Sequence, residues 1–91
     1  MDNLLTMLKV DLGIQSSTAY DERLRQYITS AKSFIVREGV LTLNASSPAD
    51  AQLIVMYAAW LWRRRDTMEG MPKALRVALN DRKFREAEQN D

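Results

Sequence analysis

The chain of 91 residues contains neither cysteine nor histidine. Without cysteine it can form no disulfide bond and no cysteine-based zinc site. Without histidine it lacks the usual general base, the commonest metal ligand and the usual partner of a nucleophilic serine. The carboxylates are scattered, and none has the spacing of a calcium-binding loop. We therefore expect a protein that is not an enzyme and that uses no cofactor and no metal ion.

Glycine and long apolar runs are also scarce. Gly13, Gly39 and Gly70 stand alone, so the sequence has no glycine-rich loop that could hold a phosphate. The most apolar stretch, residues 51–62, is shorter than the roughly 20 residues that span a bilayer. The first residues also lack the basic region that opens a signal peptide. These features predict a soluble intracellular protein without membrane contact.

The formal net charge of +1 conceals an uneven distribution. Residues 63–85 contain eight basic and three acidic side chains, whereas residues 86–91 contain three acids and no base. A basic segment of this kind suits a surface that meets a polyanion or an acidic partner. A solvated helix face followed by a frayed tail explains the same pattern, and the local evidence favours that simpler interpretation.

Hydrophobic periodicity and helix-stop signals divide the chain into about four helices, which predicts an all-α fold, a small bundle. The expected helices are residues 3–12, 19–38, 48–65 and 72–86. Gly13 and Gly39 stand where a helix ends in a left-handed residue, and an apolar residue follows each of them. We expect residues 1–86 to form a single domain and residues 87–91 to be a disordered acidic tip.

Two of these helices begin with capping signals. Thr18 and Asp21 have the spacing of a capping box, with aspartate in place of the usual glutamate or glutamine. Ser47 is followed by proline at the first helical position and by Asp50 at the third, which is the clearest helix start in the chain. Residues 40–46, just before it, alternate weakly and predict either a short extended piece or an ordered loop.

Residues 51–62, AQLIVMYAAWLW, contain one polar side chain and are the most informative feature. A helix that is apolar all round must be buried all round, and a small chain has little material to cover it. The sequence therefore predicts a long apolar central helix whose surplus faces make subunit contacts. Trp60 and Trp62 point about 160° apart on an ideal helix, so both cannot fill one small core. We expect Trp62 to anchor an interface, because tryptophan is enriched at binding hot spots.

Three consecutive arginines, Arg63–Arg65, close the third helix. Their charge complements the helix dipole, and their side chains point 100° apart, so they cannot all grip one partner backbone. Dipole compensation and interface salt bridges are the simpler interpretation. Residues 12–14 are like the turn of a helix-turn-helix, but Lys9 occupies a position that needs a small residue, which argues against that motif.

The order of these features resembles the head-tail connector (adaptor) proteins of long-tailed bacteriophages. The resemblance covers roughly residues 4–82 and departs from the family pattern after Asn80 and in the short, serine-rich loop after Gly39. The matching elements are Leu12-Gly13-Ile14; Ala19-Tyr20-Asp21-Glu22 leading to Leu24, Ile28, Ala31 and Ile35; the helix from Pro48 to Tyr57-Ala58-Ala59-Trp60-Leu61-Trp62-Arg63-Arg64; and Met71-Pro72 leading to Leu75, Leu79 and Asn80.

The resemblance implies a structural protein of the virion neck. It would assemble in the host cytoplasm as a homo-oligomeric, dodecameric ring under the portal protein, extend the DNA channel and join the capsid to a tail-completion or stopper protein. Non-specific contact with double-stranded DNA would follow from basic residues facing the channel. A small DNA-binding regulator and a helical partner-binding module are the alternatives.

The expected functional residues form two groups. The residues expected at the subunit or portal interface are Met56, Trp62, Arg63, Arg64, Arg65, Pro72, Leu75 and Leu79. The residues expected to face DNA are Arg82, Lys83 and Arg85.

Overall fold

The computed structural model describes residues 2–89 of the chain. The elements are α1 (Asp2–Leu12), α2 (Asp21–Arg37), α3 (Pro48–Arg63), a short 3-10 helix η1 (Arg64–Asp66) and α4 (Lys73–Gln89). Within residues 2–89 there are four α-helices and no strand, which confirms the all-α fold expected from the sequence.

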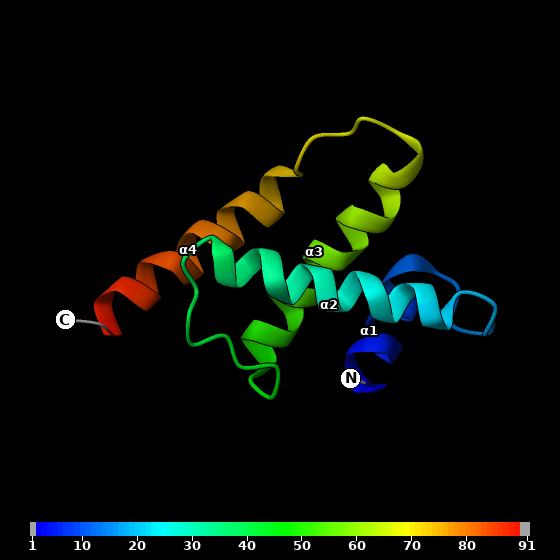
Figure 1. The fold of residues 1–91 in the computed structure, drawn as a ribbon, viewed down its shortest axis with the longest axis horizontal. Coiled ribbons are helices and arrows are strands. Elements are labelled where there is room, and N and C mark those ends of the chain that lie inside the picture. Colours follow the sequence, from blue (N-terminus) through cyan, green and yellow to red (C-terminus); the bar gives the residue numbers. More distant parts are fainter. Residues whose placement is uncertain (1, 90–91) are drawn as a thin grey trace.

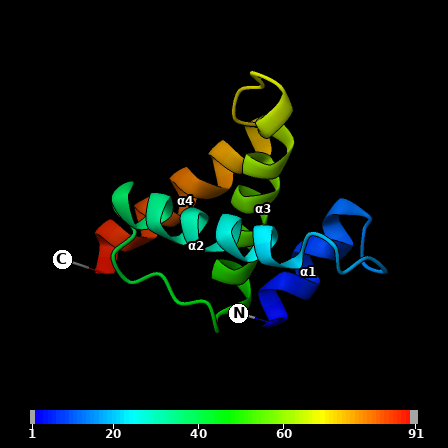
Figure 2. The same cartoon turned by 45° about the vertical axis from the view of Figure 1, so that its right-hand side comes forward.

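Helix α3 lies at the centre of the molecule. Helices α1, α2 and α4 all pack against it, and α1 also packs against α2. Helix α2 crosses α3, while α1 and α4 lie toward opposite ends of the molecule (Figure 1), and the turned view keeps them on opposite sides of α3 (Figure 2). The resulting shape is flat and elongated, with principal extents of 45 × 29 × 17 Å.

The two glycine stop signals end helices as expected. Gly13 has φ of +74° and Gly39 has φ of +118°, values that side chains other than glycine rarely adopt. The N–H of Ile14 donates to the carbonyl of Lys9 at 3.0 Å, and an equivalent bond of 3.4 Å follows Gly39. Both ends are Schellman motifs, in which the glycine lets the chain turn back and satisfy free carbonyls of the last helical turn.

The prediction of a capping box at the start of α2 is wrong. The helix begins at Asp21, and its N-cap residue, Tyr20, makes no side-chain capping bond. The Asp21 carboxylate instead lies 2.8 Å from the Lys9 ammonium and joins α2 to α1. The loop at residues 40–46 is ordered and contains no extended strand.

Helix α3 begins where the sequence indicates, although the side chains of its capping signal do not cap it. Ser47 is the N-cap residue and Pro48 occupies the first turn, but Ser47 makes no side-chain capping bond. Asp50 turns away from the helix start and accepts a hydrogen bond of 2.8 Å from Arg82 of α4. The acid that completes the sequence signal therefore serves a tertiary contact.

The C-terminal boundaries differ from those expected. The α-helical part of α3 ends at Arg63 and passes into η1, whereas α4 begins at Lys73 and continues to Gln89. The predicted disorder is therefore wrong for residues 87–89, which are helical, and residues 90 and 91 lie outside the described residues.

The core is formed by apolar faces of all four helices. It comprises Leu4, Leu5 and Leu8 of α1; Leu24, Ile28, Ala31 and Ile35 of α2; Val40; Ala51, Leu53, Ile54, Val55, Tyr57, Ala58, Ala59, Trp60 and Leu61 of α3; and Leu75 and Leu79 of α4. Nine of these nineteen residues come from α3, which explains why its sequence is so apolar.

The expected long apolar central helix with surplus faces is not found. Helix α3 has 16 residues, one fewer than α2 or α4, and no helix within residues 2–89 combines the length and apolarity needed to cross a membrane. On the back of α3, Val55 and Ala59 are only 2% and 1% exposed within a single chain. The small chain covers α3 because three other helices each present an apolar stripe to it.

Candidate functional site

The residues expected at an interface lie in different environments. Leu75 and Leu79 are 1% and 3% exposed and belong to the core, so their expected interface role is wrong. Their spacing of four residues makes them the inward stripe of α4. Pro72 and the three residues 63–65 are exposed, and Met56 is half-buried.

Trp62 lies in a half-buried cluster of aromatic side chains between α3 and α2. Its ring meets Tyr20 and Tyr27 edge to face, with centroids 5.3 and 6.0 Å away. The Arg65 guanidinium lies 3.6 Å from the centroid of the Trp62 ring and donates to the Trp62 carbonyl. We call these four residues the Trp62 patch. Large rings held rigid beside an arginine, with Tyr20 still 46% exposed, have the composition of a binding hot spot.

Trp60 lies in a separate cluster and is buried. The Trp60 ring meets the Tyr57 ring with 5.5 Å between centroids, and the Arg64 guanidinium lies 4.7 Å from the centroid of the Trp60 ring. The indole N–H donates to the Glu69 carbonyl at 3.3 Å and holds the turn after α3 against the helix. The two tryptophans thus occupy different environments, as their angular separation on the helix predicts.

The three arginines at the end of α3 also reach in different directions. Arg63 lies 3.6 Å from Asp11 of α1, whereas Arg64 and Arg65 lie over the two tryptophan rings. These contacts agree with the expectation that the three side chains do not converge on one ligand.

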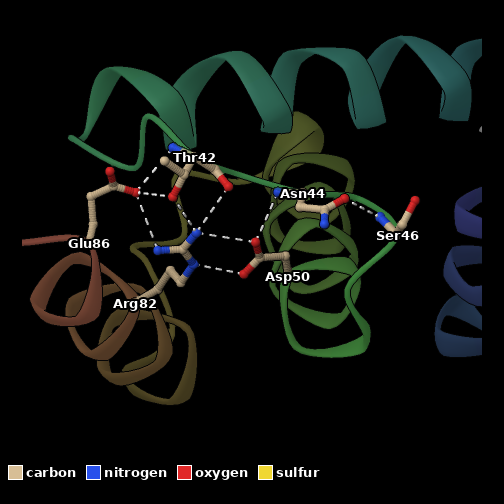
Figure 3. Close-up of polar contacts among 6 residues, drawn as sticks. All are labelled: Thr42, Asn44, Ser46, Asp50, Arg82 and Glu86. Atoms are coloured by element: carbon tan, nitrogen blue, oxygen red, sulfur yellow. Dashed lines mark hydrogen bonds and ion pairs between the residues drawn. The ribbon is translucent and has the colours of Figure 1, made fainter. Parts of the chain in front are cut away.

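A second candidate site is a buried polar cluster around Arg82 (Figure 3). The Arg82 side chain is 8% exposed, and its Nε donates to Asp50 Oδ1 at 2.8 Å. Its Nη2 donates to the carbonyl and the hydroxyl of Thr42 at 3.2 and 3.1 Å, and its Nη1 lies 3.4 Å from Glu86 Oε1. One guanidinium therefore joins α4, the start of α3 and the loop after α2.

Both carboxylates of this cluster also accept hydrogen bonds from groups other than Arg82. Asp50 Oδ2 accepts the backbone N–H of Asn44 at 2.9 Å, and Glu86 Oε1 accepts the backbone N–H and hydroxyl of Thr42 at 3.1 and 2.6 Å. We call Thr42, Asn44, Asp50, Arg82 and Glu86 the Arg82 cluster. With this many bonds, its buried charges are compensated.

The cluster keeps its ionised form. Burial by itself raises the pKa of Asp50, but the hydrogen bonds from Arg82 and Asn44 outweigh it and hold the pKa below its usual value of 3.8. The hydrogen bond to Asp50 raises the pKa of Arg82 above its usual value, against the opposing effect of burial. The charges and their bonds stabilise each other, which is typical of a structural ion pair.

The expected DNA-facing role is wrong for Arg82, whose side chain points into the molecule and donates hydrogen bonds to Asp50 and Thr42. Lys83 is half-buried and lies 3.6 Å from Glu38. Arg85 is exposed. The sequence offered one sign of the cluster, the four-residue spacing of Arg82 and Glu86, but no local pattern pairs Arg82 with Asp50, 32 residues away.

Among residues 2–89, no group of three or more histidine, cysteine, aspartate or glutamate side chains could hold a metal ion. The chain matches no protein-family model, and neither the curated proteins nor the solved structures give a match. Its function is therefore inferred from its own residues and contacts.

Proposed function

We propose that this chain is a structural subunit of a bacteriophage neck, a head-tail connector without catalytic activity. It assembles as a ring under the portal, extends the DNA channel and joins the capsid to the tail or to a stopper protein. The Trp62 patch is the observation that carries the proposal, and we assign to it the contact with the portal. The family resemblance in the sequence supplies the kind of assembly, and the patch supplies a surface suited to protein contact.

The rigidity of the subunit supports this role. A connector that binds through a preformed surface loses little conformational entropy on assembly. The Trp62 ring is fixed between two tyrosines and an arginine, and the Arg82 cluster ties α4 to two other segments. Arg85 is the remaining exposed member of the group proposed to meet phosphates of the DNA without reading its sequence.

The direct test measures the solution mass of the purified chain by light scattering over a wide concentration range. The measurement is made with the chain alone and with the portal protein encoded by the same genome. A closed oligomer, or a monomer that forms a ring only on the portal, is the expected result. A monomer or dimer that never binds the portal would overturn the proposal.

Replacement of Trp62 tests the portal-binding surface. Trp62→Ala removes the central ring of the patch, and we expect portal binding to weaken by about 30-fold or more, the effect of losing a hot spot worth about 2 kcal/mol. Circular dichroism should show that the helix content is retained. Met68→Ala is the matched control, because Met68 is a fully exposed apolar residue just after η1.

The rival functions give different results in the same experiments. Tight, sequence-selective binding of duplex DNA by the isolated chain would favour a DNA-binding regulator, for which the basic segment 63–85 is the supporting observation. A stable dimer that ignores the portal would favour a partner-binding module.

A further inference from the structure

Arg65 folds back over the end of the helix that it follows. Its guanidinium carbon lies 3.6 Å from the centroid of the Trp62 ring. Its Nη1 donates to the Trp62 carbonyl, and its Nη2 lies 3.7 Å from Asp66 Oδ2. The Arg65 side chain is 32% exposed, compared with 49% for Arg63, which lies beside Asp11. These contacts hold the Arg65 guanidinium at one place over the ring.

The Trp62 ring is contacted by three side chains. An atom 3.6 Å from the ring centroid lies over the ring face, because the atoms of the ring edge would prevent so close an approach within the ring plane. The rings of Tyr20 and Tyr27 stand at 72° and 88° to the Trp62 ring, which is the edge-to-face arrangement. Tyr20 is the N-cap residue of α2 and Tyr27 lies within that helix. The tyrosines therefore hold the ring toward α2, and Arg65 holds it toward the end of its own helix.

The 3-10 helix η1 brings Arg65 into line with Trp62. Residues three apart are offset by about 60° in an α-helix, whereas they are eclipsed in a 3-10 helix. The α-helical part of α3 ends at Arg63, so the tighter winding begins between Trp62 and Arg65. Arg64 lies over the ring of Trp60, four residues before it, which is the spacing of neighbours on an α-helix. Adjacent arginines thus reach different tryptophans.

The place that Arg65 occupies suits a guanidinium. The face of an indole ring is electron-rich and attracts a cation, and the last carbonyls of a helix carry partial negative charge and lack intrahelical donors. Arg65 meets both groups on the same residue, Trp62. A planar guanidinium can lie against a ring and still donate hydrogen bonds, which a lysine ammonium does less well.

We propose that Arg65 is a positioning residue of the Trp62 patch. It holds the Trp62 ring in the orientation in which the portal meets it, and η1 is the element that brings it there. This role rests on the proposed function and deepens it, because Arg65 acts through the ring of Trp62. A ring that is already ordered loses less conformational entropy when the partner binds.

The order of the ring is measured by NMR on the ¹⁵N-labelled chain. Its two tryptophans give two indole N–H signals, which Trp62→Phe assigns. In Arg65→Gln the heteronuclear NOE of the Trp62 indole should fall, because the ring gains motion on the picosecond-to-nanosecond scale, while the Trp60 indole stays unchanged. Arg64→Gln is the matched control, since it removes the same charge from the adjacent residue, which lies over Trp60. It should leave the Trp62 indole as ordered as in the natural chain.

Binding to the portal protein is measured with the same variants. Arg65→Gln should weaken binding by about 3- to 10-fold, the cost of immobilising one side chain that was ordered before. Arg64→Gln should weaken it less, because it leaves the Trp62 ring in place. Arg65→Lys keeps the cation but not the planar group, so it should restore part of both the ring order and the affinity.

An unchanged Trp62 indole in Arg65→Gln would overturn the positioning role. Equal losses of affinity in Arg64→Gln and Arg65→Gln would also overturn it, since they would reflect charge alone, and so would weaker binding with a ring that stays ordered. If the natural chain never binds the portal, the proposed function fails, whereas the NMR comparison still decides whether Arg65 orders the ring.

Discussion

At the scale of single residues, Arg82 joins segments that lie far apart in the sequence. Its guanidinium bonds to Asp50, Thr42 and Glu86, which come from three separate segments of the chain. An isolated buried charge is costly, but here the hydrogen-bond donors are matched by acceptors. The cluster therefore determines where α4 lies against the rest of the molecule.

Replacement of Arg82 should be strongly destabilising. Arg82→Met leaves two buried carboxylates without their cation, so we expect the free energy of unfolding to fall by about 3–5 kcal/mol. Urea denaturation followed by circular dichroism measures the change. Arg76→Met, at an exposed position of the same helix, should change it by less than about 0.5 kcal/mol. Similar losses in the two variants would show that the Arg82 cluster contributes little.

The Asp50 carboxyl should make the stability depend on acid pH. Its pKa is lower in the folded protein than the usual 3.8 expected for the unfolded chain. The unfolded state therefore takes up the proton more readily, and the stabilisation is present above pH 3.8 and is lost as the pH falls through the folded-state pKa. Thermal melts between pH 2 and 7 should show this loss. In Asp50→Asn the stability near pH 7 should be lower and this acid-dependent part should be absent; an unchanged pH profile would contradict the assignment.

At the scale of elements, the helix ends decide how the chain passes from one helix to the next. Gly13 and Gly39 each adopt a positive φ and let the next apolar residue turn back over the helix it follows. Neither glycine has a neighbour within 4 Å of the position a Cβ would take. Glycine is therefore required at these two positions by the backbone conformation and not by a lack of space for a side chain.

This distinction is testable at Gly39. Gly39→Ala should lower the free energy of unfolding by at least about 1 kcal/mol, because alanine is strained at φ of +118°. Gly70→Ala is the matched control, since Gly70 does not have a positive φ and also has open space around it. Chemical denaturation of both variants checks the prediction. A loss at Gly70 as large as that at Gly39 would contradict the backbone explanation.

At the scale of the whole molecule, α3 is covered within one chain and does not need a partner in order to be buried. Its neighbours α1, α2 and α4 all pack against it, and Val55 and Ala59 on its back are buried within the single chain. Folding therefore does not require the proposed assembly, and the two are separable steps.

The dilute chain should accordingly be folded as a monomer. Small-angle X-ray scattering at low concentration should give a radius of gyration close to the 13.1 Å of the Cα positions, compared with about 30 Å for an unfolded chain of this length. Loss of helix content on dilution would show instead that the fold depends on its neighbours in an assembly.

The sequence by itself determined the helices of this protein and the main signals at which they start and stop. Gly13, Gly39 and the Ser47-Pro48 pair act over a few residues, and apolar spacing reports one helix at a time. It also determined that Trp60 and Trp62 face different surroundings, because both lie on one helix of known geometry.

Only the tertiary structure decided which side chains are buried. Arg82 lies in a basic segment yet points inward, because Asp50, 32 residues before it, lies beside it in the fold. Leu75 and Leu79 became core and the back of α3 was covered, since other helices pack there. Such contacts join residues far apart in the sequence, and the relative positions of the helices, which local patterns do not encode, determine them.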